Sequence, residues 1–398
     1  ALSITKMECS LLCDNQDDEI KSQFYQLMNA IYSIDENSSE AETTAFNQLI
    51  QSEVTAKPIL TRIVQQSKMS LLLLTCVRGN KLVHPAIKCL IEANPSALLW
   101  RTYIDTNERV IHDIANDPSH CVLMPWIATN YQWVLDHEIC LESPPVFGLL
   151  HRYASRGETG CTAEIIRHFF EIYPRGLTQE DEDEDGCTPL HFIAEGSSEC
   201  EADLFKWMAE RCPSNTMLKR SRSGWTPLHI ACRSLTRHLG DDSSEICKYL
   251  IEQCPQSVRI PNDGEWLPIH YLLSRYRCQH RPVKEVVLSL LREYPESYDM
   301  AARTDGDPMP APSSIPFIQR IKPLLDEEIE LKENVAYLQD VAGLFRDAVD
   351  GTETPSPLAS STCEAFVNWA TVTTIQRLEA KMKQVETQLQ YECNVDEE

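Results

Sequence analysis

The chain has 398 residues, enough for two or three domains, with 16 cysteines, only 13 glycines and a formal net charge of −24. This excess of acid argues against nucleic acid or an anionic membrane as the main partner, because both repel a negative surface. No apolar run approaches the roughly 18 residues of a membrane span, and no Cys-x-x-Cys pair occurs, which favours reduced thiols and a cytoplasmic or nuclear protein.

The first segment, residues 1–69, has helical periodicity but no repeat. Apolar residues at helical spacing indicate one helix over residues 17–32, a second around 46–54 and a third at 59–64. A stack of repeats exposes an apolar face at each end, which terminal elements must cover. We therefore expect residues 1–69 to form an N-terminal helical cap for the array that follows, with a separate recognition domain as the alternative.

One pattern recurs through residues 70–314. Its clearest copy is Gly-Trp-Thr-Pro-Leu-His at 224–229, in which Thr226 is a good N-cap and Pro227 suits the first position of a helix. A fixed period of 38 to 41 residues predicts a stacked repeat protein, because one repeat cannot bury its apolar face alone. The repeats are marked by histidines spaced 38 to 41 residues apart: His112, His151, His191, His229 and His270.

Each unit continues into a second helix that ends before a proline. Counting back from that proline, the tenth residue is acidic and the ninth, eighth, fifth and fourth are apolar, which makes one helical stripe. The acid favours the positive end of the helix dipole. The prolines that end these second helices are Pro174, Pro213, Pro255 and Pro295.

This order of turn, Thr-Pro-Leu-His helix, loop and second helix resembles ankyrin repeats. The units exceed the family's usual length of about 33 residues, and the Leu-Pro-Ile-His variant at 267–270 resembles the long ankyrin arrays of diatom-like algae. The resemblance covers roughly residues 70–310. It implies an all-α fold, an α-solenoid of about six helix-turn-helix units. The second unit, around His112, is degenerate because Pro125 falls where its second helix should run.

Catalytic and metal-binding patterns are incomplete. The dinucleotide, P-loop and hydrolase motifs do not occur, and a histidine that returns in every unit serves stacking rather than catalysis. Residues 180–185 are six consecutive acids that imitate the start of a calcium loop, but its ninth and twelfth positions are Pro189 and Phe192. We predict no enzyme activity, no cofactor and no metal site.

The last region, residues 315–398, is predicted to be helical, with a Thr/Pro/Ser linker at 351–362. Apolar residues in 3-4 alternation form an a/d seam in its final helix: Ile375, Leu378, Met382, Val385 and Leu389. A hairpin of the two helices within one chain is the first interpretation. The alternative is a coiled coil that joins two chains through residues 366–391.

A series of arginines is the binding feature that we single out. Most follow the histidine position of their unit by four or five residues, so stacking would align them into a basic ridge on an acidic molecule. The alternative is local, because a cation at a helix C-terminus is favourable by ~0.3–1 kcal/mol wherever it occurs. The residues concerned are Arg78, Arg156, Arg233, Arg237, Arg275 and Arg277.

Arginine forks readily onto carboxylate or phosphate groups. We therefore predict a protein partner that presents an acidic or phosphorylated segment, and no nucleic-acid or membrane partner. The predicted function is a non-enzymatic protein–protein interaction scaffold. The alternative is a structural protein that oligomerises through its C-terminal helices.

Overall fold

The computed structural model describes residues 11–12, 16–34, 38–64, 70–78, 81–100, 109–137, 140, 144–154, 161–181, 185–195, 201–238, 241–273, 280–300, 316–351 and 357–395. The chain divides into two compact units, Ala1–Thr216 and Met217–Glu398. The fold is all-α, as predicted. Among the described helices, none is both long enough and apolar enough to cross a membrane.

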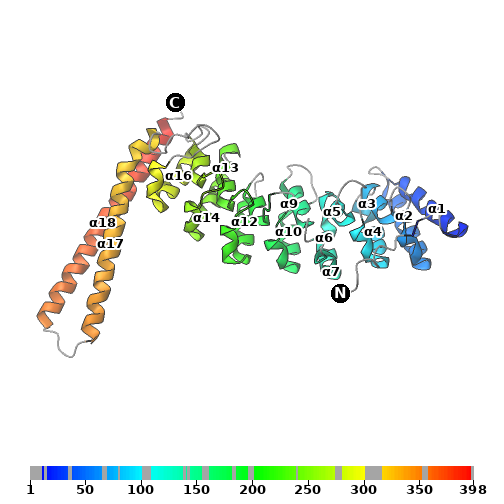
Figure 1. Cartoon of the computed structure of the whole chain (residues 1–398), viewed down its shortest axis with the longest axis horizontal. Helices are drawn as coiled ribbons and strands as arrows, with labels where there is room; N and C mark the ends of the chain where they lie inside the picture. Colours follow the sequence, from blue (N-terminus) through cyan, green and yellow to red (C-terminus); the bar gives the residue numbers. More distant parts are fainter. Residues whose placement is uncertain are drawn as a thin grey trace. The chain divides into compact units, whose positions relative to one another are not determined.

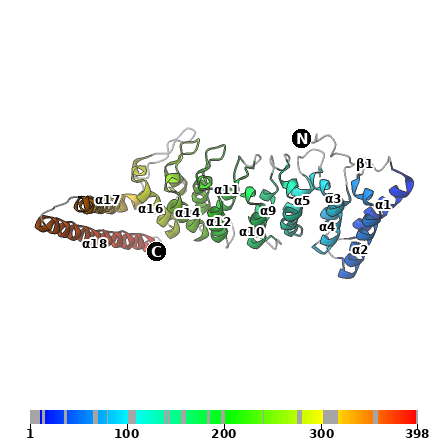
Figure 2. The same cartoon turned by 90° about the horizontal axis from the view of Figure 1, so that it is seen from below.

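The first unit is a row of helix pairs (Figures 1 and 2). The first helices of successive pairs contact one another, and so do most of the second helices. The first helices are α1 (Asp18–Tyr32), α3 (Leu71–Arg78), α5 (Val110–Asn116), α9 (Val146–Ala154) and α11 (Pro189–Ala194). The second helices are α2 (Glu40–Ala56), α4 (His84–Ala93), α6 (Met124–Asn130) followed by α7 (Gln132–Leu135), α10 (Ala163–Ile172) and α12 (Glu201–Arg211).

The second unit has two more helix pairs and a long helical hairpin. In the pairs, α13 contacts α15 and α14 contacts α16. The elements are α13 (Pro227–His238), α14 (Asp241–Gln253), α15 (Pro268–Leu273), α16 (Arg281–Glu293), α17 (Pro316–Gly351) and α18 (Pro357–Val395). Strands in the described residues are limited to one parallel pair in the first unit, β1 (Leu11–Leu12) and β2 (Ile63–Val64).

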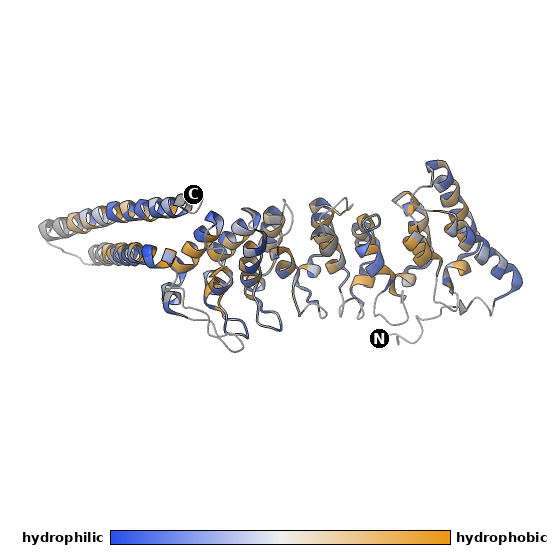
Figure 3. Ribbon diagram, turned by 90° about the horizontal axis from the view of Figure 1, so that it is seen from above, coloured by the Kyte–Doolittle hydropathy of each residue, from blue (hydrophilic) through white to orange (hydrophobic). Residues whose placement is uncertain are grey.

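Short 3-10 helices connect many of these elements. Several begin at the proline that ends a second helix, since proline has a helical φ but cannot continue the α-helical hydrogen bonds. Figure 3 shows the apolar positions lying mainly on the helices rather than on the connecting turns. The 3-10 helices are Pro58–Arg62, Lys81–Val83, Pro95–Leu99, Cys121–Leu123, Pro174–Thr178, Ser214–Leu218, Pro255–Arg259 and Pro295–Asp299.

The tyrosine before the proline that ends a second helix contacts the preceding repeat. Tyr173 Oη donates hydrogen bonds to the Leu135 carbonyl at 3.3 Å and to an Asp136 carboxylate oxygen at 3.1 Å. In the second unit, the Arg259 guanidinium lies 5.0 Å from the ring centroid of Tyr294. The recurring Tyr-Pro ending is therefore a contact between neighbouring repeats as well as the end of a helix.

The N-terminal segment contains a repeat-like helix pair that the sequence did not indicate. Helix α1 packs on α3 and α2 packs on α4, as in the later pairs. Helix α2 starts with a capping box in which Ser39 and Glu42 satisfy each other's backbone N–H groups. A 3-10 helix then begins at Pro58. This segment thus adds a further helix pair of the same arrangement, packed on α3 and α4. Its role as a cap of the array stays a prediction.

The position of Pro125 was predicted wrongly. It lies in the first turn of α6, where a missing N–H costs no hydrogen bond, and not in the helix interior. The preceding 3-10 helix Cys121–Leu123 delays the start of α6, which has only 7 residues. The unit around His112 is thus a helix pair with a shortened second helix.

The base of the hairpin packs on the last repeat through buried charges. Lys284 on α16 is 2% exposed and donates from Nζ to the Glu392 carbonyl at 2.7 Å. Two hydrogen bonds from Arg320 lower the pKa of the Glu392 carboxyl, against the effect of burial. Arg292, also on α16, donates to the fully buried Glu328 at 2.9 Å. The hairpin therefore caps the apolar face of the final helix pair.

Helices α17 and α18 lie side by side and antiparallel (Figures 1 and 2). The structure thus has the intramolecular hairpin, and α18 begins at Pro357, inside the segment predicted as a linker. Val385 is fully buried and the other members of the a/d seam are half-buried. Helix α17 accordingly covers the a/d seam, which the coiled-coil interpretation assigned to a contact with a second chain.

Candidate protein-binding site

The recurring histidines hold the starts of their own helices. The Thr226 N–H donates to Nδ1 of His229 at 3.1 Å, and the Thr188 N–H makes the same bond to His191. Because Nδ1 accepts, Nε2 carries the proton, and His229 donates it to the Trp266 carbonyl of the next repeat at 3.0 Å. The His229 ring thus connects two layers of the stack. The side chain of His151 lies outside the described residues.

Two neighbouring turns are joined at the start of α13 and α15. In the first turn, the Ser221 N–H donates to the Trp225 carbonyl at 2.8 Å, and Gly224 has a φ of +80°. A side chain at Gly224 would also collide with Asp263 of the second turn. The turns are linked by the Asp263 N–H, which donates to the Ser223 carbonyl at 3.1 Å.

A charged pair and an amide complete the joint. Arg220 Nη2 lies 2.6 Å from the Asp263 carboxylate. Asn262 accepts hydrogen bonds from the N–H groups of Gly264 and Trp266 through its side-chain oxygen. The same amide donates to the Tyr271 hydroxyl at 2.8 Å. The two turns therefore form one continuous and well-bonded surface.

This joint brings three aromatic rings and one arginine into a stack. The rings of Trp225 and Tyr271 have centroids 4.7 Å apart, and those of Trp266 and Tyr271 are 4.9 Å apart. The Arg233 guanidinium lies 4.7 Å from the Trp225 ring centroid, a cation–π contact. We call Trp225, Arg233, Trp266 and Tyr271, together with Arg220, the paired-turn site. Trp225, Arg233, Trp266 and Tyr271 are half-buried.

The surroundings of the site carry an excess of positive charge. Residues 219–238 contain no Asp or Glu, although the whole chain has a net charge of −24. Burial raises the pKa of Tyr271 to about 12, so its hydroxyl stays neutral and does not repel an anion. The cations of this stretch are Lys219, Arg220, Arg222, Arg233 and Arg237.

One comparison with known proteins identifies the repeats of this array. A family model of ankyrin repeats, in three copies, matches residues 150–262. Residues 150–262 are therefore ankyrin repeats. No curated protein and no solved structure matches the chain. The matched segment includes the first of the two joined turns, and the ankyrin pattern continues beyond it at the Leu-Pro-Ile-His sequence of 267–270.

The predicted arginine ridge is only partly described in this ankyrin array. Arg233 and Arg237 lie on α13, half-buried and exposed respectively, and Arg78 is the last residue of α3. Arg156, Arg275 and Arg277 lie outside the described residues. A ridge that joins all these side chains stays a prediction. The basic turn before α13 does not follow a repeat histidine, so the offset pattern did not predict it, whereas the absence of acids from residues 219–238 indicates it.

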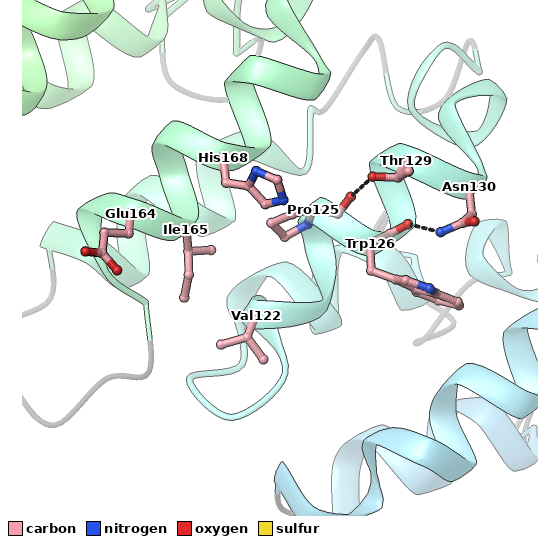
Figure 4. Close-up of a pocket in the computed structure, with 8 residues that line it drawn as sticks. All are labelled: Val122, Pro125, Trp126, Thr129, Asn130, Glu164, Ile165 and His168. Atoms are coloured by element: carbon pink, nitrogen blue, oxygen red, sulfur yellow. Dashed lines mark hydrogen bonds between the residues drawn. The ribbon is translucent and has the colours of Figure 1, made fainter.

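A hollow lies in the first unit between α6 and α10 (Figure 4). It has a volume of about 490 Å³ and is flanked by Trp126 and Ile165. Thr129 and Asn130 donate hydrogen bonds back to carbonyls of α6, at 2.8 Å each. These two polar side chains therefore hydrogen-bond within α6. The hollow is lined by Val122, Pro125, Trp126, Thr129, Asn130, Glu164, Ile165 and His168.

The acidic turn forms a small hairpin in its described part. The Asp181 N–H donates to the Cys187 carbonyl at 2.9 Å, and Asp185 and Gly186 have positive φ values of 59° and 70°. Residues 182–184 lie outside the described part. Within the residues that the structure describes, no group of three or more His, Cys, Asp or Glu side chains is arranged to hold a metal ion.

Proposed function

We propose that this ankyrin-repeat protein is a non-enzymatic scaffold that binds an acidic or phosphorylated segment of a partner protein at the paired-turn site. Ankyrin repeats in general mediate protein–protein interaction. The observation that carries the specific proposal is the stack of Arg233 on Trp225 within a stretch that has cations but no acids. The proposed location is the cytoplasm or the nucleus, where thiols such as the ten free cysteines found within residues 76–254 stay reduced.

The stack prepares Arg233 for recognition of an anion. The Arg233 guanidinium carbon lies over the Trp225 ring, which holds this side chain at the site. The N–H edge of a guanidinium is the part that forks onto a carboxylate or phosphate. The joined turns hold Trp225 in place, so less side-chain entropy is lost on binding. Arg237 lies one helical turn further along α13, on the same face, and supplies an exposed cation beside the half-buried Arg233.

The array also fits an extended ligand. Trp225 and Trp266 start successive repeats, and Tyr271 lies between their rings. A bound segment would contact the aromatic rings with apolar side chains while its acids face Arg233 and the basic turn. Tyrosine, tryptophan and arginine are the residues that most often contribute the main binding energy at interfaces.

A peptide array tests this proposal. The full chain is applied to peptides that contain acidic runs, phosphoserine, or matched neutral sequences. We expect the wild type to retain acidic and phosphorylated peptides, and the variant Arg233→Glu/Arg237→Glu to lose at least tenfold in signal. Because electrostatic attraction acts mainly on association, the loss should be greatest in the association rate.

The matched control is Arg377→Glu/Lys383→Glu, which makes the same change in net charge at exposed positions on α18. It should bind like the wild type. If both variants lose binding equally, the effect is one of net charge and the paired-turn site is not the binding surface. If neither variant loses binding, the partner binds elsewhere.

A further inference from the structure

We infer that the exposed aromatic stripe on α18 is a self-association surface, through which a second copy of this chain binds. The stripe consists of Phe366, Trp369 and Val372, which are 64%, 65% and 54% exposed. The rings of Phe366 and Trp369 contact each other, with centroids 6.0 Å apart. This inference does not depend on the proposed partner-binding function, because the stripe lies on the hairpin and not on the repeats.

The stripe lies on the opposite side of α18 from the hairpin contact. With about 3.6 residues per turn, Phe366, Trp369 and Val372 share one face of the helix. The buried positions Val367 and Val385 share another face, roughly half a turn away. Helix α17 covers that second face. The hairpin therefore buries the a/d seam within one chain but leaves the aromatic stripe uncovered.

The charge pattern identifies the occupant. Residues 365–376 contain no charged residue, although the chain as a whole carries 60 acids against 36 lysines and arginines. Two copies with a net charge of −24 each repel one another, and this repulsion is weaker at a contact between two uncharged surfaces than between two acidic ones. A basic partner protein would instead gain from acids around its contact. The neutral stripe thus fits a second copy.

The stripe is also complementary to itself. Trp369 is central, with Phe366 three residues before it and Val372 three residues after it. If two α18 helices cross antiparallel at Trp369, the large Phe366 of each copy faces the smaller Val372 of the other. A two-fold symmetric contact of this kind uses the same patch twice. It would convert two hairpins into a four-helix bundle.

The area of the stripe sets the expected strength. Covering the exposed parts of three such side chains removes roughly 350 Å² per copy, and flanking threonines extend this toward the ~1,200 Å² of a small specific interface. We therefore expect a weak, concentration-dependent dimer and not a permanent one.

Sedimentation velocity of the full chain, from nanomolar to high micromolar concentration, tests the inference. The wild type should shift from monomer to dimer within this range, and Phe366→Glu/Trp369→Glu should stay monomeric. Tyr337→Glu is the matched control, because Tyr337 is 68% exposed on α17 but lies outside the stripe. It should dimerise like the wild type.

A photo-crosslink provides a readout that does not depend on the glutamate variants. Benzoylphenylalanine in place of Val372 should give a dimer-sized band after irradiation, and the same residue in place of Tyr337 should not. A wild type that remains monomeric throughout the range overturns the inference. A dimer that persists in a correctly folded Phe366→Glu/Trp369→Glu variant overturns it equally.

Discussion

At the scale of single residues, His229 acts through both ring nitrogens. Nδ1 accepts the N–H at the start of the helix, which would otherwise be buried without a partner, and in His229 Nε2 reaches the Trp266 carbonyl of the next repeat. Such a ring must stay neutral, since protonation of Nδ1 would set two donors against each other. Position in the sequence predicted this role because a stacking group recurs in every layer.

Removing one such ring should destabilise the second unit. In His229→Ala, the Thr226 N–H and the Trp266 carbonyl lose their partner and a cavity remains, so we expect a loss of about 2–4 kcal/mol. Thermal unfolding measures this as a lower Tm. The control His280→Ala changes an exposed residue and should have little effect. An unchanged Tm in His229→Ala would contradict the stacking role.

The pH dependence of His270 follows from its burial. Desolvation lowers the pKa of His270 from its ordinary 6.5 to about 4. The unfolded chain therefore takes up a proton before the folded chain does, and stability falls as pH decreases from 6.5 toward 4. His270→Gln has no imidazole to titrate, so its free energy of unfolding should not change in this way with pH. The difference in free energy of unfolding between wild type and variant should therefore narrow by about 3 kcal/mol as pH falls over that interval. Urea unfolding at several pH values measures the gap, and a constant gap would contradict the buried neutral ring.

At the scale of elements, helix starts were easier to predict than unit boundaries. The Thr-Pro sequences fixed the beginnings of α11 and α13 at Pro189 and Pro227, because N-cap and proline act locally. The helix pair α1–α2 was not recognised as repeat-like, since it lacks the Thr-Pro-Leu-His sequence and its arrangement comes from packing on α3 and α4. Pro125 was misplaced because a 3-10 turn decided where α6 begins.

The paired-turn site shows the same limit. The sequence pointed to Arg233 and Arg237, but not to the rings that orient them. Trp225 and Trp266 are 41 residues apart in the chain, and only the joined turns bring both of their rings to Tyr271. The arrangement of side chains from different repeats depends on stacking, which one repeat alone does not specify.

The capping of the array by the hairpin can be tested at Glu328. Arg292→Met leaves this fully buried carboxylate without the hydrogen bond from α16, and we expect a loss of about 2 kcal/mol, moderated because Lys332 also lies 3.0 Å from it. The double variant Arg292→Met/Glu328→Leu should recover most of this loss, because it removes the buried charge. Chemical denaturation measures both. Additive losses in the double variant would show that the pair does not couple α16 to α17.

At the scale of the whole molecule, the chain combines a strongly negative overall charge with local exceptions. The basic stretch 219–238 is suited to an acidic ligand, and the uncharged stretch 365–376 is suited to a second copy. The acidic residues elsewhere on the chain repel non-specific anionic partners, so the basic and the uncharged stretches would determine which partners bind. Dimerisation through α18 would present two paired-turn sites and raise the apparent affinity for a partner with two acidic segments.

The salt dependence of binding tests the central claim most directly. Titration calorimetry would measure the affinity of the full chain for the best acidic or phosphorylated peptide from the array, at low and at high ionic strength. We expect the wild type to bind more weakly at high salt, because its contacts are charge-assisted and partly exposed. In Arg233→Glu/Arg237→Glu the affinity should be low at both ionic strengths. An affinity that is independent of salt in the wild type, or unchanged in the correctly folded variant, would contradict recognition of an acidic segment at the paired-turn site.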